Sequence, residues 1–154
     1  MASLLNARPE RTWNRTVASE LTVHLGRIGR IQTLTLTSER RDALRVALGE
    51  GFTDETTTIA DFCPDPLVFA LESGLPRVTL LDRVVDGGSE WEQFAELGPR
   101  SLIAVSRIAD IVERASSAGR RMIRTVYETD FRDERGVRVG VARGFSLDIE
   151  EAHA

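Results

Sequence analysis

Four side chains in this sequence have the chemistry to act in catalysis. Asp54 and Glu55 are adjacent carboxylates in the polar, threonine-rich stretch 50–58, and positioned carboxylates can donate and accept protons. His24 could do the same, because histidine changes its charge near neutral pH. Cys63 could act as a nucleophile if a neighbouring base activated its thiol. We take Asp54, Glu55 and His24 as the catalytic candidates.

Each candidate also has a purely structural interpretation. Carboxylates in a polar loop are usually just solvated, and a histidine on a strand is usually a surface residue or a satisfied core residue. No histidine lies near Cys63 in the sequence, and free cysteines are often small buried apolar residues. The chain has one cysteine and two histidines, His24 and His153, so it can form no internal disulfide. We expect neither a metal nor another cofactor.

The composition is that of one globular domain without a charged partner. The 154 residues are 42% apolar and 29% charged, with a net charge of −4 and a pI near 5.3. This balance gives no electrostatic reason to expect nucleic acid or an anionic membrane. No apolar run approaches the roughly 18 residues that a spanning helix needs, and residues 1–15 lack the apolar core of a signal peptide. We therefore expect a cytoplasmic protein.

The N-terminal third predicts two strands and a helix. Alternating β-branched and polar residues favour strands at 21–25 and 31–37, with His24 on the first and a bend at the glycines between them. A helix at 39–48 follows, because its apolar residues recur at helical spacing. The polar stretch 50–58 is expected to be a loop.

A short apolar helix is predicted next. Asp65 is a favourable N-cap and Pro66 fits the first helical position, so the helix continues through 67–71. Gly74 and Pro76 end it after about two turns. Its almost wholly apolar character predicts burial on most sides.

The rest of the sequence predicts long antiparallel strands. Strand character begins at 78–85 and resumes after Gly87, where Trp91 and Phe94 share a face only if a bulge separates them. Tight turns then join three long segments into a meander. These segments are 102–114, 122–131 and 137–149.

Together these elements predict an α+β hot-dog fold, in which an antiparallel β-sheet wraps around a central apolar α-helix. We expect residues 1–20 to form an N-terminal arm, residues 21–150 a single hot-dog domain, and residues 151–154 a tail. The long strands carry apolar residues on both faces, so the face turned away from the helix is expected to pack against another subunit. The chain should then be at least a dimer.

The block Gly87-Gly88-Ser89-Glu90-Trp91-Glu92-Gln93-Phe94 resembles a stretch of the MaoC-like dehydratase/hydratase family, in its N-terminal fatty-acid-synthase-type dehydratase domain. The strand 125–131 is similar to that family too, and 64–69 matches the Pro-rich start of its central helix. The resemblance covers roughly residues 20–150. It implies the hot-dog fold and an acyl thioester substrate on CoA or acyl carrier protein, with Phe69 and Trp91 as substrate-binding candidates.

The catalytic pair of the family is missing from this sequence. Active members carry an Asp and a His five residues apart after the first helix, because hydration needs one group to deprotonate water and another to protonate Cα. The corresponding stretch 49–58 contains Asp54 and Glu55 but no histidine and no Asn-Pro. The Gly-Asp pair that the family has before its long strand is replaced here by Gly98-Pro99-Arg100.

We therefore expect the non-catalytic, substrate-pocket partner of an (R)-specific enoyl-thioester hydratase or 3-hydroxyacyl-thioester dehydratase. Its partner would be a related, dyad-bearing hot-dog subunit or a second copy of itself. Two alternatives stay open. One is a stand-alone hot-dog enzyme with altered chemistry, such as a dehydratase or cyclase on a polyketide-type substrate, in which Asp54, Glu55 or His24 transfers the proton. The other is a module that binds an acyl ligand without turnover.

Overall fold

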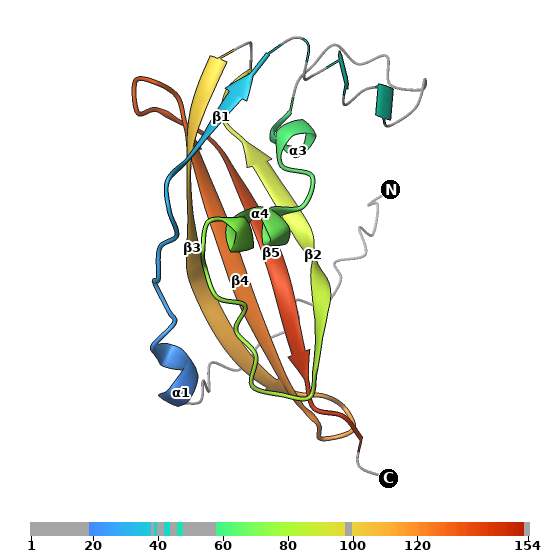
Figure 1. Ribbon diagram of the computed structural model, residues 1–154. Coiled ribbons are helices and arrows are strands. Elements are labelled where there is room, and N and C mark those ends of the chain that lie inside the picture. Colours follow the sequence, from blue (N-terminus) through green and yellow to red (C-terminus); the bar gives the residue numbers. More distant parts are fainter. Residues whose placement is uncertain are drawn as a thin grey trace, which may run out of the picture.

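A computed structural model describes residues 19–37, 39, 42–43, 46–47, 58–97 and 100–152. Short helices and long strands make up the described part of the chain (Figure 1). In chain order the elements are α1 (Ser19–Thr22), β1 (Gln32–Leu36), α3 (Ile59–Phe62), α4 (Pro66–Glu72), β2 (Arg83–Gln93), β3 (Arg100–Ala115), β4 (Arg121–Arg132) and β5 (Arg138–Ile149). None of the helices among these residues has the length and apolar character needed to cross a membrane.

The strands form one curled antiparallel sheet in the order β1-β3-β4-β5-β2. β3, β4 and β5 are the predicted meander, joined by turns at 116–119 and 133–136. α4 lies across β4 and β5 on one side of the sheet (Figure 1). We call this side the inner face and the opposite side the outer face. The arrangement confirms the predicted sheet wrapped around a helix.

The inner face of β4 forms the centre of the core. Its side chains alternate as predicted, and the five that point towards α4 are all buried: Ile123, Thr125, Tyr127, Thr129 and Phe131. Two apolar clusters cover this face, one around α3 and the other around α1 and the end of α4. The Tyr127 hydroxyl donates to the Pro76 carbonyl at 2.8 Å and accepts from Val78 N–H at 2.9 Å, so it fastens the segment after α4 to the sheet.

α4 begins and ends as the sequence predicts. The Asp65 carboxylate accepts a hydrogen bond from Val68 N–H at 3.1 Å, and Pro66 occupies the first turn. Gly74, with φ of 94°, adopts the left-handed conformation that ends many helices. The prediction of burial on most sides is confirmed, because Phe69 and Leu71 also pack against the core and only Val68 and Glu72 are exposed. Leu67 and Ala70 are buried against the sheet, whereas Val68 on the opposite side is 47% exposed.

Glycines in β5 bring α4 very close to the sheet. A Cβ atom on Gly144 would lie 2.3 Å from the Leu67 nitrogen and 2.6 Å from its Cα. A Cβ on Gly140 would lie 2.6 Å from Ile59 Cγ1 in α3. Only a residue without a side chain permits these approaches. The helix-facing side of β5 is therefore small, and its larger residues, such as Phe145 and Leu147, point to the outer face.

Three sequence predictions differ from the structure. The stretch 21–25 is not a strand: α1 ends at Thr22 and a turn follows, in which His24 N–H donates to the Leu21 carbonyl at 3.0 Å. The strand predicted from residue 78 begins only at Arg83, because Tyr127 and Asp148 bind the backbone of 78–81. α3 was not predicted. The predicted helix 39–48 and loop 50–58 lie largely outside the described residues.

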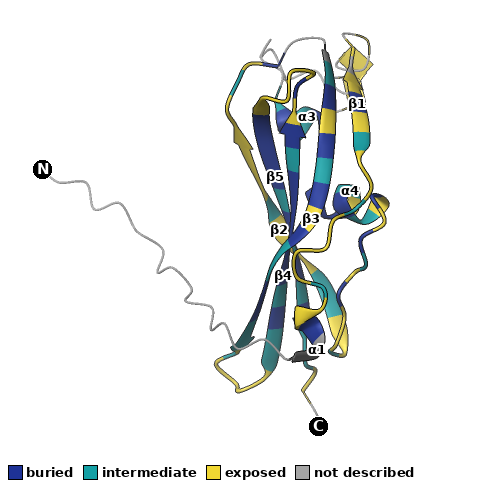
Figure 2. Cartoon of the chain, turned by 90° about the vertical axis from the view of Figure 1, so that its left-hand side faces the viewer, coloured by how far each residue is buried: buried dark blue, intermediate teal, exposed yellow. Residues whose placement is uncertain are grey.

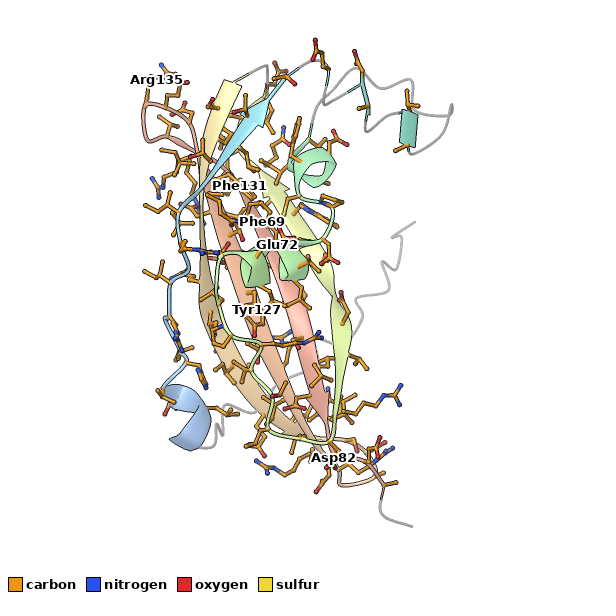
Figure 3. All side chains as sticks on the ribbon, viewed as in Figure 1. Phe69, Glu72, Asp82, Tyr127, Phe131 and Arg135 are labelled. Atoms are coloured by element: carbon orange, nitrogen blue, oxygen red, sulfur yellow. The ribbon has the colours of Figure 1, made fainter. Side chains whose placement is uncertain are left out.

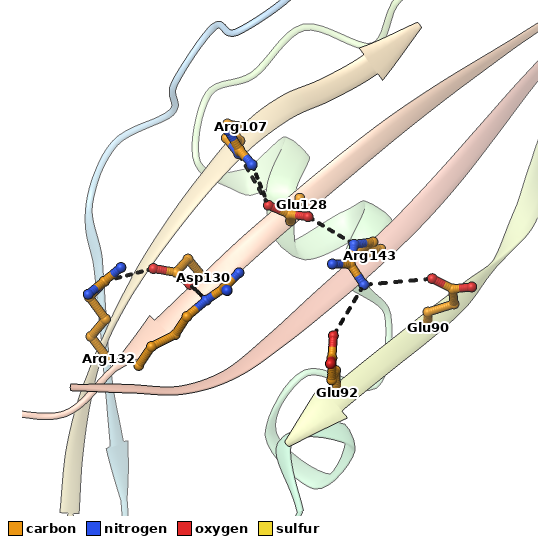
Figure 4. Close-up of polar contacts among 8 residues, drawn as sticks. Glu90, Glu92, Arg107, Glu128, Asp130, Arg132 and Arg143 are labelled. Carbon is orange, nitrogen blue, oxygen red and sulfur yellow. Dashed lines mark hydrogen bonds and ion pairs between the residues drawn. The ribbon is translucent and has the colours of Figure 1, made fainter. Parts of the chain in front are cut away.

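The outer face carries a row of ion pairs across four strands (Figure 4). Glu128 on β4 binds Arg107 on β3 at 2.7 Å and Arg143 on β5 at 2.8 Å. Arg143 in turn lies 3.8 Å from both Glu90 and Glu92 on β2. The long edge strand β2 is mostly exposed (Figure 2). The outer face is thus more polar in its middle than the apolar pattern of the strands predicted.

Candidate functional site

A hollow of about 520 Å³ lies between the edge strand β1 and the segment that joins α3 to α4. We call it the α4 groove. Its volume is typical of sites that hold small organic ligands, and most of its lining is apolar. The lining residues are Gln32, Thr33, Leu34, Phe62, Cys63, Pro64, Asp65, Val68, Phe69 and Glu72.

The wall between α3 and α4 is held in place by β2. Trp91 Nε1 donates to the Cys63 carbonyl at 2.8 Å, and Ile59 N–H donates to Gln93 Oε1 at 3.1 Å. At the start of α3, Thr58 N–H donates to the Asp61 carboxylate at 2.7 Å. These bonds satisfy backbone groups that a short helix leaves unpaired, so the wall has a defined position against the sheet.

The floor of the groove is aromatic. The rings of Phe69 on α4 and Phe131 on β4 lie 5.9 Å apart between their centroids, tilted by 43°, and both side chains lie between the helix and the sheet (Figure 3). Phe131 is buried, whereas Phe69 is partly exposed and lines the groove. Beside them, Gln32 Oε1 is buried without a hydrogen-bond partner. The floor can therefore contact an apolar group but offers it little hydrogen bonding.

The electrostatics of the groove are negative. Asp65 and Glu72 stand exposed at the two ends of α4, and the residues named as its lining include no arginine or histidine. Burial, together with the charges of Asp65 and Glu72, raises the pKa of Cys63 to about 12. The thiol is therefore protonated at neutral pH, and it is neither a nucleophile nor a ready metal ligand.

The structure does not bring the predicted catalytic residues together. Asp54 and Glu55 lie outside the described residues. His24 follows α1, at the end of the sheet away from α3, and its Nδ1 is buried without a partner (Figure 1). His24 is also absent from the residues that line the groove. Within the described ranges, no three histidine, cysteine or carboxylate side chains cluster in a way that could hold a metal ion.

The two predicted substrate-binding residues have different positions. Phe69 lines the groove directly. Trp91 lies behind the groove wall and is 41% exposed, with its indole nitrogen bonded to the Cys63 carbonyl. Phe94 points to the outer face, where Arg138 stacks on its ring at 5.3 Å, so it does not share a face with Trp91. The bulge in β2 occurs earlier, at Gly87.

Sequence reasoning missed Gln32 and Glu72 as groove residues. Gln32 is the first residue of β1, at an inward position of the alternating stretch Gln32–Leu36. Glu72 lies two helical turns after Asp65, which places both carboxylates on the same side of α4. The spacing of Asp65 and Glu72 was visible in the sequence, but the position of α4 beside β1 was not.

A second hollow of about 510 Å³ lies at the opposite end of the sheet. Its charged lining residues are of both signs, with Arg83 and Arg120 beside Glu150 and Glu151. It is formed by a turn and the end of β5, far from α4. The α4 groove lies against the central helix and is lined by Phe62 and Phe69, so we take it as the candidate site.

Comparison with known proteins identifies the fold. The MaoC-like dehydratase from Rhodospirillum rubrum superimposes with a TM-score of 0.54 and 13% sequence identity, covering 84% of this chain and 94% of that one. The HadBC (3R-hydroxyacyl-ACP dehydratase) complex from Mycobacterium tuberculosis gives a TM-score of 0.54 and 14% identity, over 80% of this chain and 96% of that one. This chain has the hot-dog fold.

A third structure supports the same assignment. The full-length peroxisomal multifunctional enzyme type 2 from Drosophila melanogaster gives a TM-score of 0.51 and 14% identity, over 82% of this chain and 24% of that one. No protein-family model matches the hot-dog chain, and no curated protein is detectably similar to it in sequence. The fold that the resemblance to MaoC-like proteins implied is therefore confirmed, at identities that show a shared fold and no more.

Proposed function

We propose that this chain is the non-catalytic, acyl-binding partner of a cytoplasmic (R)-specific enoyl-thioester hydratase or 3-hydroxyacyl-thioester dehydratase. The observation that carries the proposal is an apolar groove of ligand size whose described lining contains no histidine to complete an Asp–His pair. Hydration of a double bond requires two positioned proton-transfer groups. The groove offers Asp65 and Glu72 but no histidine.

The start of α4 supports the same conclusion. The resemblance to MaoC-like proteins implies that backbone N–H groups at the start of the central helix would polarise a thioester carbonyl. Here the carboxylate of Asp65 already accepts the Val68 N–H. A negative charge at this position disfavours the charge that develops on a carbonyl oxygen during reaction. The groove is thus suited to hold an acyl group and poorly suited to activate one.

The solved structures with the same fold indicate what the proposed pair would consist of. One of them is a complex, described as a 3R-hydroxyacyl-ACP dehydratase. By analogy, this chain would pair with a related hot-dog subunit that carries the Asp and His. Its substrates would be acyl thioesters on CoA or acyl carrier protein.

Affinity purification from the native host, with mass spectrometry of what co-purifies, tests the pairing. We expect a stoichiometric second hot-dog chain with an Asp and a His five residues apart. If only copies of this chain are recovered, the pairing is wrong. If the chain purified alone hydrates a short trans-2-enoyl thioester, it is catalytic and the proposal is wrong in its central point.

A groove variant tests the acyl-binding role within the recovered complex. Phe69→Ala removes the aromatic side chain that lines the groove, so KM for an enoyl thioester should rise by about tenfold while kcat changes little, because Phe69 would contact the acyl chain and not the reacting atoms. Glu151→Gln, at the opposite end of the sheet, is the matched control and should change neither constant. An unchanged KM in Phe69→Ala would exclude the α4 groove as the acyl site.

A further inference from the structure

The α4 groove combines an apolar floor with a rim of one charge sign. Asp65 caps the start of α4 and Glu72 is its last residue, so the two carboxylates flank Val68 and Phe69 on the open side of the helix. Asp65 uses one carboxylate oxygen to cap the helix. No cationic side chain is among the described residues that line the groove.

The field of both carboxylates reaches the interior of the groove. Cys63 also lines the groove, and the pKa of its thiol is raised first by burial and then by the charges of Asp65 and Glu72. At this end of α4, the Arg30 guanidinium donates to the Glu72 backbone carbonyl at 3.1 Å. An anion that entered the groove would be repelled by the same two carboxylates, in addition to the cost of its burial.

We propose that the α4 groove selects against anionic ligands, so that it admits an acyl group only in its uncharged, esterified form and excludes the free carboxylate. This inference rests on the proposed acyl-binding role and deepens it. With its tail in the groove, a free acid would place its carboxylate at the rim beside Asp65 and Glu72. With its head inside, it would place the charge against Phe62, Phe69 and Leu34, where desolvation is costly.

The consequence is discrimination between a thioester and the acid that its hydrolysis releases. Both share the same alkyl chain and therefore gain the same apolar contacts. They differ in one charge, which the rim repels. The carboxylates are exposed, so water and salt weaken the repulsion, and the preference for the ester should be roughly three- to tenfold at low ionic strength. It should shrink at 1 M salt, where the screening length is only about 3 Å.

Three eight-carbon probes of different charge test the inference on the purified full chain by calorimetry. They are S-octanoyl-N-acetylcysteamine, which is neutral, octanoate, which is anionic, and octylamine, which is cationic. We expect the thioester and the amine to bind more tightly than octanoate. In the double variant Asp65→Asn/Glu72→Gln, octanoate should gain several-fold in affinity. Asparagine still caps the helix, so the variant should keep its fold, which its denaturation midpoint will verify.

Glu151→Gln is the control variant, since it removes a carboxylate at the other end of the sheet, and it should leave all three affinities unchanged. If octanoate binds wild-type protein as tightly as the thioester, selection by charge is overturned while acyl binding stands. If octylamine is as weak as octanoate, desolvation and not the rim carboxylates discriminates, and the inference is again wrong. If no probe binds, acyl binding by the groove fails, and the selection by charge fails with it, whatever partner co-purifies.

Discussion

The two faces of the sheet are built from the same strands by different means. On the inner face, β4 and β5 meet α4 through fitted shapes, in which Gly144 leaves room for the backbone of Leu67. On the outer face, β4 and β5 meet β3 and β2 through charges, with Glu128 held between Arg107 and Arg143. The first arrangement tolerates almost no change of volume, whereas the second is exposed to water and can rearrange.

The difference indicates where the free energy of unfolding is concentrated. Close-packed interiors respond to a single methyl group, because neighbouring atoms cannot move away without losing their own contacts. Ion pairs at a surface typically contribute about 0–1 kcal/mol, since water already solvates both charges. Substitutions of fully buried residues on the inner face should therefore be more damaging than those of the outer face, and the substitutions below test this order.

The largest effect is expected for Gly144→Ala. Its new Cβ would lie 2.3 Å from the Leu67 nitrogen, so α4 must move off the sheet, which should cost about 3 kcal/mol. Gly87→Ala is the matched substitution on the outer side, with its Cβ 3.0 Å from Leu147 Cγ, and should cost about 1 kcal/mol because that side chain can shift. Urea denaturation measures both. Equal losses of unfolding free energy in the two variants would contradict the proposed difference between the faces.

Tyr127→Phe comes next. The substitution leaves the Pro76 carbonyl and the Val78 N–H without their buried partner, which should cost about 2 kcal/mol. Burial is also the main cause that raises the pKa of Tyr127 above its ordinary value of 10.0. The neutral phenol is thus favoured in the folded state, so wild-type stability falls as the pH rises above 10.

The comparison of Tyr127→Phe with wild type at alkaline pH isolates this contribution. The variant has no phenol to ionise, so the stability gap between the two proteins should narrow above pH 10. Urea midpoints measured at pH 8 and at pH 10.5 give the gap at each value. A constant gap would mean that the Tyr127 hydroxyl does not titrate differently in the folded and unfolded states.

Local features of the fold could be predicted from the sequence. The N-cap at Asp65, the turn at 133–136 and the alternation along β4 each depend on neighbours within a few residues, and the structure has all three. The stretch 21–25 has the same alternating character as a strand, yet it forms α1 and a turn. There Gly26 N–H donates to the Ile108 carbonyl on β3, so a tertiary contact decided what the local pattern left open.

The candidate site could be predicted only in part. Phe69 was predicted through the resemblance to MaoC-like proteins, but Gln32 and Glu72 meet in the groove only because β1 pairs with β3 and α4 crosses the inner face. The apolar residues of β5 were a strong signal that could not be assigned to a face. The side of β5 that contacts α4 is the side with the smallest residues, Gly140, Ala142 and Gly144, which carries almost no hydrophobic pattern.

Glu128→Gln tests the outer face directly and should cost about 1 kcal/mol. Burial alone would raise the pKa of Glu128, but hydrogen bonds and charges from Arg107 and Arg143 outweigh it and hold that pKa below its ordinary value of 4.5. The contribution is therefore present above pH 4.5 and lost as the pH falls further. The variant should match wild type in acid, and its deficit at pH 7 should shrink in 1 M salt. A deficit that persists at pH 3 would point to lost packing and not to lost charge.

The smallest effect on stability is expected for Trp91→Phe. The same substitution tests whether Trp91 only supports the groove wall or contacts the ligand. The substitution removes the bond from Trp91 Nε1 to the Cys63 carbonyl, which should cost about 0.5 kcal/mol because the side chain is 41% exposed and water can replace it. If Trp91 only supports the groove wall from behind, Trp91→Phe should weaken binding of a neutral octanoyl thioester by no more than about twofold, since the wall itself stays in place. Phe69→Ala, measured in the same titration, removes the floor and should weaken it by about tenfold or more. If Trp91→Phe equals Phe69→Ala in its effect on affinity, Trp91 contacts the ligand directly, and the groove must extend beyond the residues that line it here towards β2.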